Sequence, residues 1–165
     1  MFATIGYEKC KPEDFVATLQ ACRIDILIDI RERAQSRRAG FSKTALSKSV
    51  AQANIDYIHF RELGDPKAGR DAARQGKIEK FRGIFLEVLA SKPAQEALSK
   101  IKLLMQSKRI CFMCYERDYR LCHRKMVADH FEMLLGCKFV HLEVEQNESK
   151  LSIGRVFHTR EGAAA

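Results

Sequence analysis

The sequence lacks any long hydrophobic run and any recognisable targeting segment. No apolar stretch approaches the roughly 18–20 residues that a transmembrane helix needs, so we expect no membrane-spanning helix and no membrane partner. The N-terminus has no basic segment followed by an apolar one, so we expect no secretory signal and a cytoplasmic location. In that reducing compartment the six cysteines are expected to remain free thiols.

Internal repeats and long basic runs are absent as well. Without a repeat, a solenoid or propeller is not expected, and 165 residues are typical of one domain. We place that domain at residues 1–146 and predict an irregular C-terminal tail at 147–165, where apolar periodicity ends. The formal net charge of +8 favours an anionic small molecule or a nucleic acid as partner. The alternative is a solvated basic surface.

Short apolar segments predict strands, and segments with helical periodicity lie between them. Strands are expected at residues 2–6, 25–30, 56–60, 109–115 and 138–144. Helices are expected around residues 12–22, 46–53, 81–89, 97–105 and 127–135. This alternation predicts an α/β three-layer sandwich, with a mainly parallel sheet of about five strands and helices on both faces. The charged segment 61–80 is expected to be a long loop or mobile lid.

Polar residues follow four of the predicted strands. The carboxyl ends of parallel strands meet at one edge of the sheet, and open α/β sheets bind ligands there. We therefore expect one site at this edge. The residues expected to contact its ligand are Gly6, Tyr7, Arg31, Arg33, Ser36, Arg37, His59, Cys114 and Arg124.

Arginine is the commonest residue in this set. The guanidinium groups expected to form a cluster for a phosphate or carboxylate are those of Arg31, Arg33, Arg37 and Arg124. The alternative is that Asp29 and Arg31 simply pair at the sheet edge. The segment 31–38 could also follow a nucleic-acid backbone, although few aromatic side chains accompany it for base stacking.

Two carboxylates are candidates for general acid/base chemistry. Asp29 and Glu116 each lie at the end of a buried strand near arginines, and paired carboxylates could support glycosidic chemistry. The alternative is that they only orient the arginines. His59 could transfer protons or simply pack in the third strand.

The segment 114–124 leads from a buried strand into a helix through Cys122-His123-Arg124. With Asp118 as the N-cap, the free backbone N–H groups and the helix dipole would lower the pKa of a thiol. Cys122 could then be a thiolate nucleophile with His123 as its base, or Arg124 could hold a phosphate. The alternative is that Cys122 is a small core residue.

Two formal cysteine motifs in or beside this segment are rejected, and a metal site is not favoured. Cys114 and Arg120 have the spacing of a phosphatase loop, but the residues between them include two acids and no glycine. Cys111 and Cys114 stand three apart in a strand and face opposite ways. A metal site built from Cys114, Cys122 and His123 is geometrically possible but lacks a clear fourth ligand, so we expect neither a metal nor a cofactor.

Together, these motifs resemble a bacterial family known as domain of unknown function 488. They are Thr4-Ile-Gly6, Asp29-Ile-Arg31, Ser36-Arg37, Phe41, Tyr57-x-His59, Leu63-Gly64, Cys114-x-Glu116 and Cys122-His123-Arg124. The resemblance covers about residues 1–144 and implies a three-layer α/β fold with a shared polar pocket, but no established reaction. The chain looks like a divergent member. It departs from the family pattern at Tyr7-Glu8 (usually His-Ser), Ala34 (usually proline), Asp65 (usually glycine) and Asp118-Tyr119 (usually Asp-Pro).

These observations favour a hydrolase- or transferase-like enzyme that acts on a nucleotide, a phosphosugar or a nucleic-acid component. One alternative is a non-catalytic module that binds nucleic acid or a nucleotide through the same basic edge. A third hypothesis is a thiol-dependent enzyme that uses Cys122 or Cys114.

Overall fold

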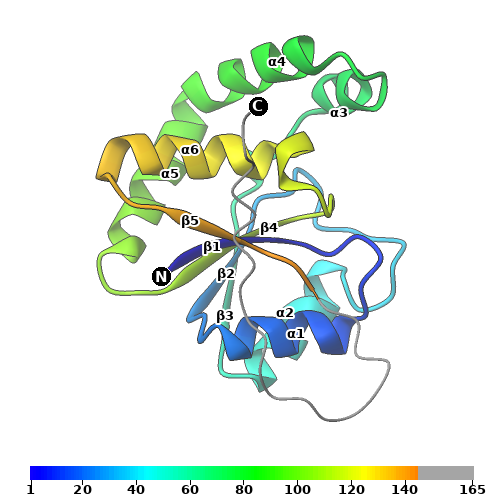
Figure 1. Cartoon of the computed structure of the whole chain (residues 1–165), viewed down its shortest axis with the longest axis vertical. Helices are drawn as coiled ribbons and strands as arrows, with labels where there is room; N and C mark the ends of the chain where they lie inside the picture. Colours follow the sequence, from blue (N-terminus) through cyan, green and yellow to red (C-terminus); the bar gives the residue numbers. More distant parts are fainter. Residues whose placement is uncertain (145–165) are drawn as a thin grey trace, which may run out of the picture.

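Five apolar segments form one parallel sheet in the computed structural model, which describes residues 1–144 (Figure 1). The strands are β1 (Phe2–Gly6), β2 (Ile26–Asp29), β3 (Asp56–His59), β4 (Ile110–Cys114) and β5 (Phe139–Leu142). Their order across the sheet is β3-β2-β4-β1-β5, and every neighbouring pair is parallel. The chain has the three-layer α/β fold that its alternating pattern predicts.

Helices cover both faces of this sheet (Figure 1). On one face lie α1 (Pro12–Ala21) and α2 (Lys43–Gln52). On the other lie α3 (Lys67–Arg74), α4 (Ile78–Ala90), α5 (Lys92–Met105) and α6 (His123–Leu135). None of the helices within residues 1–144 is both long enough and apolar enough to cross a membrane.

Side-chain alternation along the central strand β4 divides the core in two. Ile110 and Phe112 pack towards α4, α5 and α6, whereas Cys111 and Met113 pack towards α1 and α2. Cys114, the next residue, lies on the α6 side, where it meets His123. Cys111 and Cys114 therefore lie on opposite faces of the sheet, as their spacing predicts.

The register of the sheet brings the carboxyl ends of its strands level. Gly6 of β1 pairs with Cys114 of β4, and Asp29 of β2 pairs with both Met113 of β4 and His59 of β3. The polar residues that follow these strands consequently lie along one edge, where parallel α/β sheets bind ligands.

The expected long loop at 61–80 is wrong. It contains a 3₁₀ turn η1 (Arg61–Leu63), all of α3 and the start of α4. A 2.5 Å ion pair joins Arg70 of α3 to Glu32 after β2, and Ala72 is buried, so a mostly charged segment folds as a helix against the edge. The tail predicted at 147–165 lies outside the described residues.

Candidate functional site

The residues expected to share one pocket form two separate groups at the carboxyl edge. One is a buried ion pair, Asp29–Arg31, on the face covered by α1 and α2. The other, here called the thiol cluster, consists of Cys114, Glu116, Cys122 and His123 on the face covered by α6. The polar residues thus lie at the expected edge of the sheet, but they are divided between its two faces.

The Asp29–Arg31 pair is satisfied within the protein. Arg31 donates from Nε and Nη2 to the Asp29 carboxylate, with an Nη2–Oδ2 distance of 2.6 Å. Its Nη1 donates to the Tyr7 hydroxyl and to the Phe41 carbonyl. The Tyr57 hydroxyl donates to Asp29, and burial followed by this carboxylate raises the pKa of Tyr57. Asp29 is fully buried, so it orients Arg31, the role that the sequence left as the alternative to general acid/base chemistry.

Several further residues predicted to bind ligand are occupied in holding the loop that follows β2. His59 Nε2 lies 2.8 Å from the Arg31 carbonyl oxygen, so the ring holds the backbone of this loop. Ser36 accepts a hydrogen bond from the Arg38 amide, and its own amide donates to Ser42. Tyr7 stacks on Phe41 with ring centroids 4.5 Å apart. These contacts make the loop a defined structure beneath the exposed Arg33 and Arg37.

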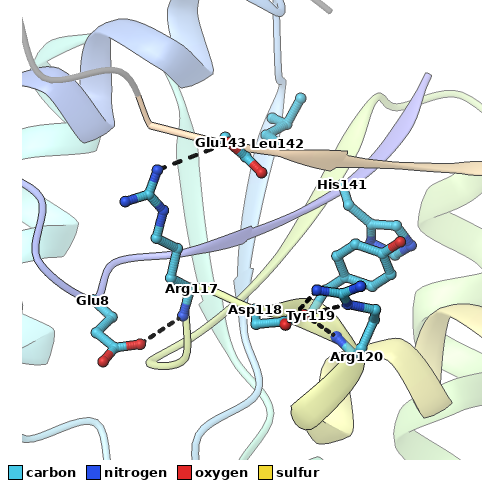
Figure 2. Close-up of a pocket in the computed structure, with 8 residues that line it drawn as sticks. All are labelled: Glu8, Arg117, Asp118, Tyr119, Arg120, His141, Leu142 and Glu143. Carbon is cyan, nitrogen blue, oxygen red and sulfur yellow. Dashed lines mark hydrogen bonds and ion pairs between the residues drawn. The ribbon is translucent and has the colours of Figure 1, made fainter. Parts of the chain in front are cut away.

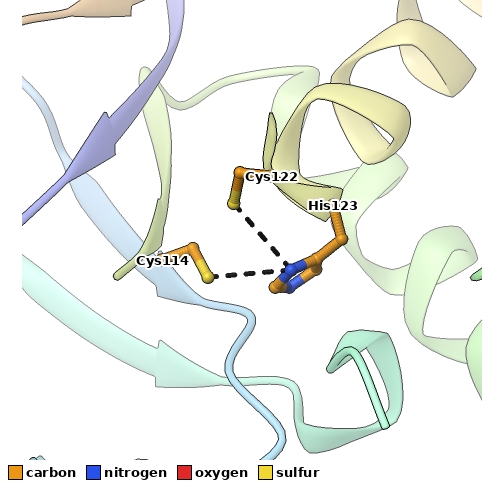
Figure 3. Close-up of side chains that lie close together, drawn as sticks. All are labelled: Cys114, Cys122 and His123. Carbon is orange, nitrogen blue, oxygen red and sulfur yellow. Dashed lines mark hydrogen bonds between the residues drawn. The ribbon is translucent and has the colours of Figure 1, made fainter. Parts of the chain in front are cut away.

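The thiol cluster joins the end of β4 to the start of α6 (Figure 3). Cys114 is the last residue of its strand, Cys122 is the N-cap of α6, and His123 is the first residue of that helix. The Nδ1 atom of His123 lies 3.7 Å from the Cys114 sulfur and 3.9 Å from the Cys122 sulfur. All three residues are at most 4% exposed. Asp118 caps the 3₁₀ turn η2 (Tyr119–Leu121) instead of α6, which corrects the predicted N-cap.

Glu116 completes this cluster from the turn after β4. The Cys114 thiol donates to Glu116 Oε2 across 3.2 Å. Unlike Cys114, Glu116 is only partly buried. Burial, followed by the charge of Cys122, raises the pKa of Glu116 to about 7. Glu116 is therefore the most accessible member of the cluster.

The pKa values of the titratable groups in the thiol cluster are strongly shifted. Burial opposes ionisation of Cys122, but the Cys114 thiol and the charges of Arg124 and His123 lower its pKa well below the usual thiol value. Burial also opposes the charge on His123, yet Cys122 and Glu116 raise its pKa to about 9. Burial raises the pKa of Cys114. The arrangement favours a thiolate on Cys122 beside an imidazolium on His123.

Arg124 holds the turn that carries Glu116. Its side chain is 1% exposed and donates to the Glu116 carbonyl, to the Arg117 carbonyl across 2.9 Å, and to the Thr4 hydroxyl across 3.3 Å. Arg124 and Arg31 thus lie on opposite faces of the sheet, each bound to protein groups. The expected cluster of four guanidinium groups does not form, because two of its members are structural.

Gly6 is needed because the same turn passes directly over it. A Cβ atom at this position would lie 1.9 Å from the Glu116 carbonyl oxygen and 2.7 Å from its carbon. Real Cβ contacts are never this short, so only glycine lets the backbone of Glu116 approach the end of β1. Gly6 was expected to contact the ligand, whereas the role that the structure gives it at the site is steric.

Asp65 was missed by the sequence reasoning about the site. It is 6% exposed, its Oδ1 has no hydrogen-bond partner within residues 1–144, and burial raises its pKa to about 6. The charges of His123 and Cys122 both act on this carboxyl. The only signal in the sequence was that an aspartate stands where the resembling family usually has glycine.

A polar hollow of about 270 Å³ opens beside the thiol cluster, at the ends of β1 and β5 (Figure 2). Its lining residues are Glu8, Arg117, Asp118, Tyr119, Arg120, His141, Leu142 and Glu143. The Tyr119 ring stacks on His141 with centroids 3.6 Å apart, and His141 Nδ1 lies 2.8 Å from the Thr4 hydroxyl. The acids and arginines of this hollow largely pair with one another, so its charge is mixed.

Acidification is expected to weaken the fold through His141. Its pKa is lowered from 6.5 to about 4, first by burial and then by the positive charges of Arg124 and Lys125, which Glu132 and Asp129 only partly offset. The unfolded chain therefore takes up this proton at higher pH than the folded chain does. We expect the free energy of unfolding to fall between pH 6.5 and pH 4, as measured by urea denaturation. The fall should be smaller in His141→Gln, and an equal fall in both proteins would contradict this assignment.

Comparison with known proteins identifies one family. The family model of Domain of unknown function DUF488 matches residues 11–131. This match spans both the Asp29–Arg31 pair and the thiol cluster. No curated protein and no solved structure matches the chain.

Proposed function

Since this chain belongs to the DUF488 family, whose description assigns no reaction, its activity has to be inferred from its own site, and we propose a hydrolase- or transferase-like enzyme. Its substrate would be anionic: a nucleotide, a phosphosugar or a nucleic-acid component. The observation that carries the proposal is the convergence of Glu116 with two thiols and an imidazole at the carboxyl edge of a parallel sheet. Four reactive side chains from the strand end, the turn and the helix start meet there, although none of them is needed to build an apolar core.

Glu116 is the proposed general acid/base. It is the accessible member of the thiol cluster, and its backbone is fixed by the hydrogen bond from Arg124 to its carbonyl oxygen. A carboxyl group held in one place can exchange a proton with a bound ligand without first reorganising. Cys114 and Cys122 are 4% and 2% exposed, so direct attack by either thiol on an external substrate is a weaker candidate.

Arginines that follow β2 and β3 would recruit the anion. Arg33, Arg37 and Arg61 are exposed, and none of them forms an ion pair with another described residue. Together with a formal net charge of +8, they would raise the local concentration of an anionic substrate. This role replaces the one that Arg31 and Arg124 were expected to have.

We also propose that the protein works in the bacterial cytoplasm. All six cysteines are free, including two whose sulfur atoms share one histidine nitrogen. Thiols in this arrangement persist most readily in a reducing compartment.

Substitution of Glu116 tests the proposed enzyme. The full chain would be incubated with a panel of nucleoside phosphates and hexose phosphates, and products followed by chromatography. We expect turnover of at least one of them, and a loss of kcat of about 10²–10⁴-fold in Glu116→Gln, because the variant cannot transfer the proton. The matched control is Glu79→Gln on α4, whose side chain is 87% exposed, and it should keep the activity of the unchanged protein.

A second pair of variants tests the recruitment of the anion. Combining Arg33→Ala with Arg37→Ala should raise KM while kcat stays close to that of the unchanged protein, because uniform binding is lost. The control is Arg82→Ala on the exposed face of α4. If the panel gives no turnover and the chain instead binds duplex nucleic acid with a steep salt dependence, a binding module replaces the enzyme.

A further inference from the structure

We propose that Cys114, Cys122 and His123 bind a Zn²⁺ ion. The Nδ1 atom of the histidine and the two sulfur atoms all lie within 4.8 Å of one another, and all three residues are buried. Within residues 1–144, no other group of three potential metal ligands gathers in this way. The proposal concerns binding and does not depend on the enzymatic function proposed above.

The separations between these atoms are close to those of a zinc centre. With Zn–S bonds of about 2.3 Å and Zn–N bonds of about 2.0–2.1 Å, tetrahedral geometry places sulfur about 3.6 Å from nitrogen. The observed distances from His123 Nδ1 are 3.7 Å to Cys114 and 3.9 Å to Cys122. Both sulfur–nitrogen distances are thus within a few tenths of an ångström of those in a zinc centre.

The orientation of the His123 ring independently supports metal binding. Its Nε2 lies 2.9 Å from the Ile30 carbonyl oxygen, which can only accept a hydrogen bond, so Nε2 carries the proton. When metal binding displaces the Nδ1 proton of the imidazolium, the ring presents the lone pair of Nδ1 to the two sulfur atoms (Figure 3). Histidines that bind a metal through one ring nitrogen typically donate a hydrogen bond from the other ring nitrogen, often to a backbone carbonyl.

Other cysteines of the chain provide an internal comparison. The thiols of Cys10, Cys111 and Cys137 donate to backbone carbonyl oxygens of Tyr7, Phe112 and Phe131. These are the ordinary contacts of thiols that only pack. Cys114 and Cys122 instead face a histidine nitrogen, although they come from a strand and a helix that are connected by a turn.

We place the Glu116 carboxylate beside the remaining coordination position, as a neighbour of the ion and not as its fourth ligand. Its Oε2 is 3.2 Å from the Cys114 sulfur, about as far as two neighbouring ligands of one ion stand apart. Three protein ligands with a carboxylate next to the remaining position is an arrangement used by zinc hydrolases. That catalytic use of the ion would rest on the function proposed above, whereas binding of the ion would not.

Metal analysis of the full chain tests the proposal directly. Protein produced with zinc in the medium should contain about one Zn²⁺ per chain by mass spectrometry of the elements, as a single site requires. Replacement of zinc by Co²⁺ should give the strong charge-transfer absorption of thiolate ligands, and X-ray absorption should detect two sulfur neighbours. Chelation should lower the Tm, because the ion binds only the folded chain.

Serine variants locate the site. Cys114→Ser and Cys122→Ser should each lose the zinc and the cobalt–thiolate absorption, whereas the matched control Cys137→Ser, a partly exposed thiol just after α6, should retain both. The proposal is overturned if the unchanged protein binds neither ion through sulfur, or if Cys122→Ser holds as much zinc as Cys137→Ser. It is also overturned if Cys114 and Cys122 form a disulfide in protein purified with zinc.

If the serine variants do not fold, measurements on the unchanged protein still decide whether it binds zinc through sulfur. Its cobalt absorption and sulfur count depend on no substitution. The readouts are also separate from turnover: a protein that holds zinc but converts no substrate contradicts the proposed enzyme alone, and an active protein without metal contradicts the zinc site alone.

Discussion

Replacing Asp29 with alanine is expected to destabilise the protein by about 3–5 kcal/mol, because it leaves the Arg31 guanidinium buried without a counterion. Asp29 is fully buried and Arg31 is 5% exposed, so water cannot take the place of the lost carboxylate. The Tyr57 hydroxyl would lose its acceptor at the same time. Denaturation by urea, followed by circular dichroism, would measure the loss.

The chain contains a matched control for this prediction. Asp25 forms an ion pair of the same kind with Arg109, at 2.7 Å, but both side chains are partly exposed. Asp25→Ala should therefore cost clearly less than Asp29→Ala, since solvent screens an exposed pair. Exchanging both members of the buried pair for apolar residues, Asp29→Leu with Arg31→Met, should restore part of the stability. Equal losses in Asp25→Ala and Asp29→Ala would show that burial of the pair has no energetic consequence.

Gly6→Ala is expected to be the most damaging conservative substitution near the site. The added methyl group would overlap the Glu116 carbonyl oxygen at 1.9 Å, and the obstacle is backbone that Arg124 holds in place. Overpacking a protein core typically costs about 1–3 kcal/mol. We expect Gly6→Ala to lower the free energy of unfolding by at least the upper end of that range. Because the turn has to move, Glu116 would leave its position beside Cys114, so the zinc content or the turnover should fall as well.

Gly83→Ala is the control for this second prediction. Gly83 lies in the exposed part of α4, and a Cβ atom there would meet nothing within 4 Å. Alanine is the better helix former, so this variant should be stabilised by up to about 1 kcal/mol. A Gly6→Ala protein as stable as Gly83→Ala would mean that the turn over β1 is free to move, and the account of Gly6 would fail.

The sheet edge could be predicted because its signals are local. A continuous apolar run such as Ile110–Cys114 marks a buried strand, and polar residues directly after such runs have to emerge at one end of a parallel sheet. Glu116 and Cys122 were correctly expected near this edge for that reason. The helix within residues 61–80 could not be predicted in this way. Helix α3 buries few apolar residues of its own and is held by an ion pair between Arg70 and Glu32, which are far apart in the sequence.

The roles of the arginines could not be predicted from residue type. A guanidinium group after a strand suits a phosphate and a carboxylate equally well, and its partner depends on which face of the sheet it enters. Arg31 turns towards Asp29 beneath α1 and α2, whereas Arg124 reaches the backbone of Glu116 and Arg117 beneath α6. Every residue has a backbone carbonyl oxygen, so no sequence motif predicts which carbonyls will accept the hydrogen bonds of Arg124.

The sequence by itself determined the α/β class, the parallel strands and the edge at which polar residues gather, because hydrophobic periodicity and strand polarity are properties of short segments. Only the tertiary structure decided how the residues of that edge divide between two faces. The packing of α6 against β4 places Cys122 and His123 opposite Cys114, and it buries Arg124 under the turn that carries Glu116. Such juxtapositions depend on how the strand and the helix cross in three dimensions, which residue spacing does not specify.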